Sequence, residues 1–224
     1  MRVGVYYAPR FLDPLWELGA TWLGRDPETN APIEQPNIPN IAEVTADARM
    51  YGFHATLKPP MALRAGVTWD QVVTAAEEVA GSLAPFDLPR LEVADLHGFL
   101  ALRDAEPSAA LQELADCCVK GLDHLRAPPG EAELERRRRS RLSAAQDAML
   151  VRWGYPYVLD TWFFHMTLTR RLTPAELGVF RPATEAMFAD TLRAPRRVMD
   201  LCLFVQASPG AAFTLAERLP LQGR

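Results

Sequence analysis

A short tract of five residues occurs twice in this chain, once in each half. Residues 53–57 read Phe-His-Ala-Thr-Leu, and residues 164–168 read Phe-His-Met-Thr-Leu. In a β-strand, alternate side chains point to opposite faces of the sheet. Each tract, interpreted as a strand, carries a histidine and a threonine on one face and three apolar side chains on the other. Burial of both apolar faces would leave two polar faces free to meet in one cleft.

The same order of elements follows each tract: a helix with a threonine N-cap, and then two strands. The predicted elements are a helix over 69–83 with strands over 86–95 and 97–103, and a helix over 174–191 with strands over 196–206 and 211–218. The spacing of roughly 110 residues is far longer than that of a solenoid repeat. We therefore expect an α+β fold of two pseudo-symmetric lobes, each an antiparallel sheet with helices, that face each other across a central cleft.

This interpretation makes the 224 residues one bilobal domain. We expect the lobes to be residues 1–106 and 153–224, joined by a helical segment over 107–152. The predicted helices of that segment are 107–126 and 131–152. Near the N-terminus we expect a strand over 2–8, a helix that begins at Asp13-Pro14, and a proline-rich loop over 27–48.

Composition excludes several classes of protein. Hydrophobic residues at 49% and charged residues at 23% are ordinary for a globular domain. The formal net charge of −4 argues against a general nucleic-acid-binding protein. Three cysteines do not make a disulfide framework. The N-terminus lacks the apolar core of a signal peptide, and no run approaches the roughly 18–20 apolar residues of a membrane span. These features predict a cytoplasmic protein without a membrane partner and leave the oligomeric state open.

The polar faces of the two tracts carry groups suited to acid–base chemistry on a phosphate. A histidine has a reference pKa near ~6.5, so small shifts let one imidazole be neutral while its twin is protonated. His54 and His165 can then accept and donate the two protons of phosphate-ester cleavage. Thr56 and Thr167, on the same faces, are candidates to bind the phosphoryl oxygens. Alternation also makes Lys58 a candidate to supply positive charge.

Histidines in strands can also have structural roles or bind metal ions. A histidine in a single buried strand is usually structural, but the duplication favours chemistry for both tracts. A metal site usually needs three or four protein ligands, and no cysteine or carboxylate lies at ligand spacing around His54 or His165. We expect no metal and no cofactor. His97 and His124 lie outside the repeats, and we expect structural or solvent roles for them.

The paired tracts and their duplicated layout resemble the 2H phosphoesterase superfamily, which includes RNA-ligase-like 2′-5′ enzymes and cyclic phosphodiesterases. More narrowly, the chain resembles the branch found with phosphonate-degradation genes. The resemblance runs nearly end to end and also rests on residues 7–9, 22–26, 51–60 and 153–158. It implies that His54 and His165 are catalytic and that Thr56 and Thr167 are the hydroxyl pair. One departure is Met50 before Tyr51, where a basic residue is expected; Arg49 lies one position earlier.

Three further features are candidates for substrate contact. The run from Arg136 to Arg141 favours a solvated, partly self-paired helix face, with contact to a substrate anion as the alternative. Tyr155 lies just before the second tract, where it would line the cleft or pack in the core or a loop. Arg171 has the same strand parity as His165, and we expect it to contact phosphate.

These observations predict a metal-independent phosphoesterase that hydrolyses a cyclic phosphodiester of a small sugar phosphate or nucleotide. The resemblance implies a ribose cyclic phosphate from phosphonate breakdown as the substrate. A first alternative is a 2′-5′ RNA phosphodiesterase or ligase that acts on RNA ends. A second is a non-catalytic module that binds a phosphorylated metabolite. Turnover, as opposed to stoichiometric binding, would separate the enzyme from the binding module.

Overall fold

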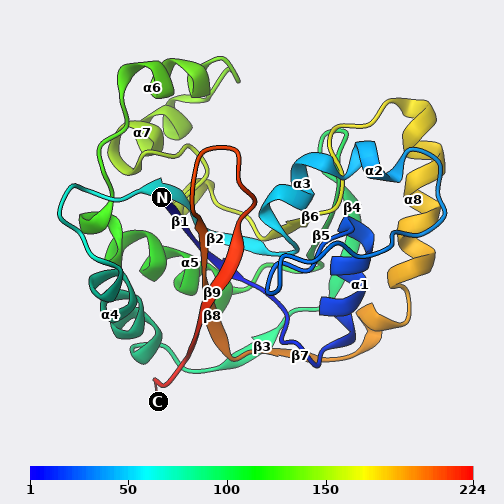
Figure 1. The fold of residues 1–224 in the computed structure, drawn as a ribbon, viewed down its shortest axis with the longest axis horizontal. Coiled ribbons are helices and arrows are strands. Elements are labelled where there is room, and N and C mark those ends of the chain that lie inside the picture. Colours follow the sequence, from blue (N-terminus) through cyan, green and yellow to red (C-terminus); the bar gives the residue numbers. More distant parts are fainter. Residues whose placement is uncertain (224) are drawn as a thin grey trace.

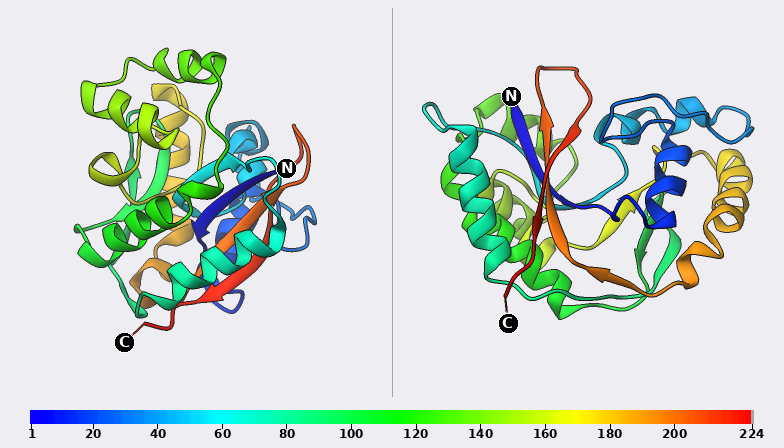
Figure 2. Two further views of the ribbon diagram at one scale, coloured as in Figure 1. Left: turned by 90° about the vertical axis from the view of Figure 1, so that its left-hand side faces the viewer. Right: turned by 60° about the horizontal axis from the view of Figure 1, so that its bottom comes forward.

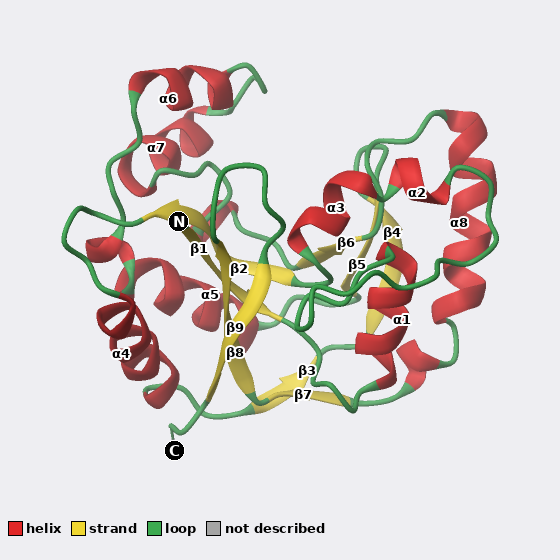
Figure 3. Ribbon diagram, viewed as in Figure 1, coloured by secondary structure: helices red, strands yellow, loops and turns green. Residues whose placement is uncertain are grey.

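A seven-stranded antiparallel sheet runs through the middle of the computed structural model, which describes residues 1–223 (Figure 1, Figure 3). Its strand order is β4-β5-β6-β2-β1-β8-β9. The strands are β1 (Arg2–Tyr7), β2 (Ala55–Ala62), β4 (Leu91–Asp95), β5 (Leu100–Asp104), β6 (His165–Thr167), β8 (Asp200–Gln206) and β9 (Thr214–Pro220). A separate ribbon pairs β3 (Phe86–Leu88) with β7 (Arg196–Val198).

The α+β class with antiparallel strands, expected from the sequence, is confirmed. The strands of the two chain halves interleave, however, because β8 and β9 continue the sheet from β1 while β6 pairs with β5. The expected lobes, 1–106 and 153–224, therefore do not form separate sheets. The two histidine tracts, in β2 and β6, are neighbours at the centre and join the two parts of the sheet.

Helices cover the apolar face of the sheet in two groups, which lie at opposite ends in the right-hand view of Figure 2. On one side α4 (Trp69–Gly81) packs on β9 and α5 (Ala109–Gly121) packs on β2. On the other side α1 (Pro14–Leu23) packs on α8 (Pro174–Phe188), and Trp22 of α1 meets Phe180 and Phe188 edge-on. These helices and the apolar strand faces form one core. The opposite face of the central strands is left for the polar side chains.

The helices that follow the two tracts begin where the sequence predicts. Thr68 accepts a hydrogen bond from the backbone of Gln71 at the start of α4, and Thr173 accepts one from Glu176 at the start of α8. In both cases the third helical residue returns a bond to the cap, which completes a capping box. Within residues 1–223, every helix is too short or too polar to cross a bilayer.

The segment expected as one helix over 131–152 is two helices, α6 (Glu131–Arg138) and α7 (Ala144–Trp153). Arg141, in the turn between them, adopts a left-handed backbone with φ 52°. Ser143 then caps the second through a capping box with Gln146. Because α6 buries none of its residues, no tertiary packing stabilises a continuous helix through the arginine run.

Two smaller differences have local causes. The polar loop expected over 27–48 ends in two short helices, α2 (Ile41–Val44) and α3 (Ala46–Tyr51), in which the buried Ile41 and Val44 pack into the core. The strand expected over 86–95 is divided at Pro89, between β3 and β4, since proline lacks the N–H that a ladder requires. Three single turns complete the chain: η1 (Asp123–Leu125), η2 (Leu159–Thr161) and η3 (Thr191–Arg193).

Candidate active site

The register between β2 and β6 determines which polar side chains meet. Ala55 lies opposite Met166, and both side chains are fully buried. In an antiparallel pair, the residues one step to either side also lie opposite each other, with their side chains on the other face. The polar face of the pair therefore carries the two histidines and the two threonines, with His54 opposite Thr167 and Thr56 opposite His165.

This quartet has approximate two-fold symmetry, because each threonine lies opposite the histidine of the other tract. The two histidines occupy one diagonal, for which the Cα atoms are about 7–8 Å apart. The arrangement depends on a contact between residues more than a hundred positions apart, so no local pattern specifies it.

Both histidines are anchored in the same way. The Nδ1 atom of His54 lies 2.9 Å from the carbonyl oxygen of Gly52, and Nδ1 of His165 lies 3.2 Å from the carbonyl oxygen of Phe163. A carbonyl can only accept, so Nδ1 carries the proton and Nε2 is the free nitrogen of the neutral ring. Nε2 of His54 lies 3.2 Å from Oγ1 of Thr56.

Gly52 is required for the first of these anchors. Its φ of 80° is a left-handed conformation that glycine adopts without strain. A Cβ atom at this position would lie 2.7 Å from the side chain of Pro27. The carbonyl that orients His54 is therefore presented by a residue that tolerates no side chain.

The two rings differ in what they stack against. His54 lies on Tyr6 of β1, with ring centroids 3.7 Å apart and planes 25° apart. His165 lies on Phe163, with ring centroids 4.7 Å apart and planes 26° apart. Tyr6 is fully buried, whereas Phe163 is 45% exposed. His54 therefore stacks on a ring of the protein interior, whereas His165 stacks on a ring that faces solvent.

These surroundings make both imidazoles weaker bases than a free histidine. Desolvation lowers the pKa of His54 to about 4; the Gly52 carbonyl opposes the shift, and the positive charge of His165 adds to it. Desolvation also lowers the pKa of His165, against the Phe163 carbonyl. Without a bound anion, both rings are neutral at neutral pH. The influence of His165 on His54 is further reason to treat the two rings as one site.

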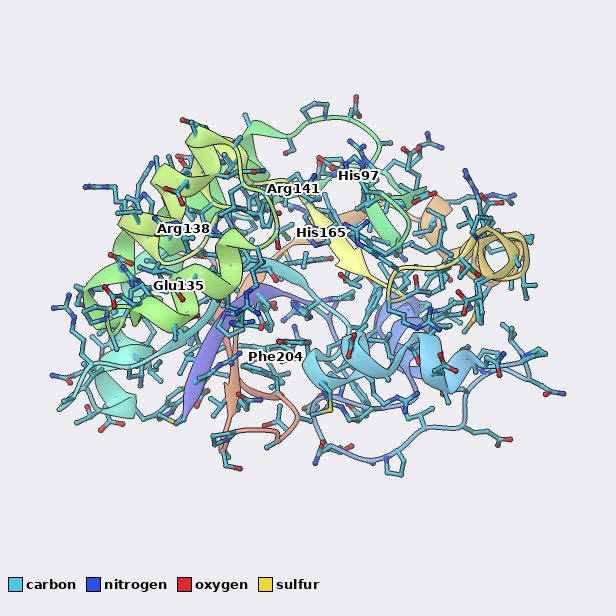
Figure 4. All side chains as sticks on the ribbon, turned by 90° about the horizontal axis from the view of Figure 1, so that it is seen from above. His97, Glu135, Arg138, Arg141, His165 and Phe204 are labelled. Atoms are coloured by element: carbon cyan, nitrogen blue, oxygen red, sulfur yellow. The ribbon has the colours of Figure 1, made fainter. Side chains whose placement is uncertain are left out.

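A cavity of about 580 Å³ opens beside this quartet, and Thr56 and His165 contribute to its lining. Ser143 and Gln146 at the start of α7 form another part of the wall. Figure 4 looks onto this side of the molecule, where His165 lies near the centre with His97 and the α6–α7 segment beside it. A smaller hollow of about 310 Å³, beside Arg10 and Arg196, contains no histidine.

Two of the residues predicted to contact substrate line the same cavity, namely Tyr155 and Arg171. Arg171 donates a hydrogen bond to the backbone carbonyl of His97, which holds its guanidinium at the cavity. The guanidinium of Arg137 lies over the ring of Tyr155, 4.8 Å from the centroid. Burial raises the pKa of Tyr155, so its hydroxyl is a hydrogen-bond donor at any working pH.

Lys58 does not reach this cavity, contrary to the alternation expected along the tract. The pairing of β1 with β2 shifts register between Val5 and Tyr6, and this irregularity turns Lys58 toward α5. Its Nζ donates to the carbonyl of Val119 at 3.0 Å and lies 3.5 Å from Asp123. The side chain is 2% exposed, and desolvation lowers its pKa to about 8. Lys58 is thus an internal lysine at the C-terminal end of α5.

Arg49, the basic residue near the first tract, is also structural. Arg49 donates from Nε to the carbonyl of Leu23 at 2.6 Å and from Nη2 to Gln35 at 2.8 Å. These bonds tie α3 to the end of α1. The arginine run is partly self-paired, as expected, with Arg137 on Glu133 at 2.9 Å, while Arg138 pairs with Asp147 of α7 at 2.7 Å.

Three site residues were missed by the sequence interpretation. His97 lines the cavity, although its place at a strand junction indicated a structural role. Trp162 donates from Nε1 to the carbonyl of Thr56 at 2.8 Å and so links the two tracts. Tyr6 supports His54. The alternation of the first strand puts Gly4 and Tyr6 on one face, and this was the available signal for Tyr6.

A metal centre would need several ligands close together. Among residues 1–223, no three His, Cys, Asp or Glu side chains come together in that way. The residues that the chain offers at this cavity are imidazoles, hydroxyls and a guanidinium, which suit an anion.

Comparison with known proteins identifies relatives of this chain. A family described as "Protein of unknown function (DUF1045)" matches residues 56–214. Two curated proteins named ribose 1,5-bisphosphate phosphokinase PhnN are similar along the chain. The one from Janthinobacterium sp. (strain Marseille) is 39% identical and aligns with 100% of this chain and 51% of the relative. The one from Laribacter hongkongensis (strain HLHK9) is 38% identical, over 96% and 50%. The chain spans about half the length of these relatives.

Solved structures with a similar course of the chain have low sequence identity to it. One described as a phosphoesterase has a TM-score of 0.45 at 13% identity, with 98% of both chains covered. E. coli LigT complexed with 3′-AMP has a TM-score of 0.44 at 15% identity, over 98% of this chain and 97% of that one. TT0787 of Thermus thermophilus has a TM-score of 0.47 at 16% identity, over 100% and 99%.

Proposed function

The chain belongs to the DUF1045 family, and we propose that it is a metal-independent phosphoesterase that opens a cyclic phosphodiester by two-histidine acid–base catalysis. The observation that supports this most directly is the pairing of Ala55 with Met166, which puts the two histidines and the two threonines on one face, with Nε2 of His54 3.2 Å from Oγ1 of Thr56. Acid–base cleavage of a phosphodiester needs one proton acceptor, one proton donor and hydrogen-bond donors for the non-bridging oxygens. The quartet contains each of these groups.

We assign the base to His54 and the acid to His165. His54 has a pKa of about 4, so it is neutral and able to accept a proton from water. The water oxygen bonds to phosphorus while one ring P–O bond breaks, and His165 protonates the departing oxygen. A bound phosphate beside His165 favours its protonated form. Thr56 and Thr167 donate to the non-bridging oxygens, and the two histidines return to their starting states by exchanging protons with solvent.

For the substrate, we propose a ribose 1,2-cyclic phosphate that carries a second phosphate at the 5-position. Opening the P–O bond to O2 of this ester with one water yields ribose 1,5-bisphosphate. The relatives that match this chain over half their length are named for a kinase acting on ribose 1,5-bisphosphate. A phosphoesterase linked to such a kinase would supply its substrate. Arg171 and Tyr155 line the cavity and are our candidates to contact the sugar and its second phosphate.

The test is hydrolysis of a panel of cyclic phosphates in excess chelator, with ribose 1,2-cyclic phosphates and nucleoside 2′,3′-cyclic phosphates side by side. We expect turnover of the 5-phosphorylated ribose ester, and a loss of at least about 100-fold in His54→Gln and in His165→Gln. His124→Gln is the matched control, because His124 lies in turn η1, outside both histidine tracts. It should keep full turnover.

Three outcomes would contradict the proposal. Full activity in either His54→Gln or His165→Gln would exclude the acid–base assignment. Stoichiometric binding of the cyclic phosphate without turnover would favour the binding module instead. Preference for an oligonucleotide with a 2′,3′-cyclic end would replace the sugar phosphate by RNA as the substrate.

A further inference from the structure

The ring of Tyr6 supports His54 in a way that the acid–base scheme does not use. The two rings are nearly parallel, with centroids 3.7 Å apart. Tyr6 lies opposite Thr56 in the pairing of β1 with β2, so its side chain is on the polar face of the sheet, beside the quartet. Tyr6 is fully buried there, in a cluster that includes Phe204 and Phe213.

The backbone of β1 is built to admit this ring. Gly4 and Tyr6 lie two residues apart and share a face of the strand. A Cβ atom at Gly4 would lie 2.5 Å from the hydroxyl of Tyr6 and equally close to its ring. Any residue larger than glycine would push the tyrosine out of its place under His54.

The hydroxyl of Tyr6 contributes little to the fold. Within residues 1–223, it is the one buried side-chain polar atom without a hydrogen-bond partner. Burial of a polar group without a partner is unfavourable. The shortest ring contact of Tyr6 is the stack on His54, and the next is with Phe204, which lies tilted with its centroid 5.0 Å away.

We propose that Tyr6 is a positioning residue for His54, whose ring face holds the imidazole in place and stabilises the imidazolium formed when His54 accepts a proton. The face of an aromatic ring carries negative electrostatic potential and attracts a cation stacked on it. The inference rests on the proposed function in assigning the base to His54. His165 stacks on the exposed Phe163, where solvent can also stabilise a charged ring.

Other charged and titratable groups surround this pair. They are His165 of β6, Tyr51 of α3, Arg2 of β1 and Tyr155 after α7. The guanidinium of Arg2 lies over Phe213, 5.4 Å from its centroid, and, like a charged His165, it would oppose protonation of His54. In the part of the chain that the structure describes, no carboxylate is salt-bridged to His54. The Tyr6 face and the Gly52 carbonyl are thus the neighbours that favour its charged form.

The experiment compares three variants at pH 6.5. Tyr6→Leu keeps an apolar side chain but removes the ring face, and Tyr6→Phe keeps the face but removes the hydroxyl. Phe204→Leu is the matched control, because Phe204 packs in the same cluster and lies tilted, 6.1 Å from His54. We expect kcat to fall about fivefold to tenfold in Tyr6→Leu with KM nearly unchanged. In Tyr6→Phe and Phe204→Leu, kcat should stay within about twofold of the wild type.

A second readout does not depend on turnover. The His54 side chain is titrated by NMR in each variant, with His54→Gln used to assign its signals. In Tyr6→Leu, the pKa of His54 should fall by about half a unit or more, and in Tyr6→Phe it should not change. Because this titration needs no substrate, it tests the stack even if the proposed function fails.

Three results would overturn the inference. An unchanged titration of His54 in Tyr6→Leu would show that the ring does not affect the imidazole. A loss of kcat in Phe204→Leu equal to that in Tyr6→Leu would attribute the effect to packing. A loss in Tyr6→Phe equal to that in Tyr6→Leu would transfer the role from the ring face to the hydroxyl.

Discussion

Two histidines with the same local sequence acquire different chemistry from their neighbours. Each gives Nδ1–H to the carbonyl two residues earlier, so the tract itself sets the tautomer. The rings they stack on then separate them, since Tyr6 is buried and Phe163 is exposed. In the proposed mechanism, the deeper ring is the base and the ring nearer to solvent is the acid.

At the residue scale, kcat/KM should follow a bell-shaped pH profile with its maximum below pH 7. Below about pH 4, His54 is protonated and cannot act as a base. As the pH rises, His165 loses its proton, at a pKa that desolvation holds below 6.5. Initial rates from pH 3.5 to 8.5 measure both limbs. A maximum above pH 7.5 would contradict the assignment. The alkaline limb of kcat should lie at higher pH than that of kcat/KM, because bound phosphate favours protonated His165.

Removal of the Tyr6 hydroxyl should stabilise the protein. The hydroxyl is buried without a partner, so Tyr6→Phe removes an uncompensated desolvation cost of about 1 kcal/mol. Urea denaturation should show a free energy of unfolding higher by that amount. A variant less stable than the wild type would mean that the hydroxyl has a partner, such as an ordered water, in solution.

At the scale of elements, the alternation of side chains along a strand predicts their faces only while the pairing register is regular. It holds from His54 to Leu57 and fails one residue later, because β1 and β2 shift register next to Lys58. The helix caps Thr68 and Thr173 were predictable, since a cap depends on residues three positions apart. The break between α6 and α7 was missed, although Ser143 with Gln146 forms the same motif.

Replacement of Lys58 should change the pH dependence of stability and leave the candidate active site intact. We expect Lys58→Met to keep full activity, because the ammonium contacts α5 and not the cavity. The pKa of Lys58 is lowered from 10.5 to about 8. Between those values the unfolded chain holds a proton that the folded chain has lost, so wild-type stability rises with pH. In Lys58→Met this rise should be absent in denaturation measured from pH 7.5 to 10. A more than tenfold loss of activity in Lys58→Met would indicate that Lys58 binds phosphate.

At the scale of the whole molecule, a single sheet carries the site and a helical segment covers one side of it (Figure 1). The interleaved strands place residues from both chain halves on each side of the β2–β6 junction. The α6–α7 segment contributes Ser143 and Gln146 to the cavity wall, yet α6 buries none of its residues. Of the two helices in this segment, α6 is thus the less firmly packed, since α7 buries Leu150.

Hydrogen–deuterium exchange should show this difference. The amides of α6 should exchange much faster than those of α5, a helix with five buried side chains. Binding of a substrate that fills the cavity should slow exchange in the α6–α7 segment. Equal protection of α6 and α5 in the free protein would contradict the prediction.

Local patterns in the amino-acid sequence specify a histidine and a threonine on one face of each tract, the apolar face behind them and the helices that follow. These features depend on residues within a few positions of each other, where strand alternation and capping operate. The pairing of Ala55 with Met166, the turn of Lys58 into the core and the position of Tyr6 beneath His54 come instead from tertiary packing. Each of those depends on pairing between distant segments, which is selected by burial of the whole apolar face and not by any local pattern.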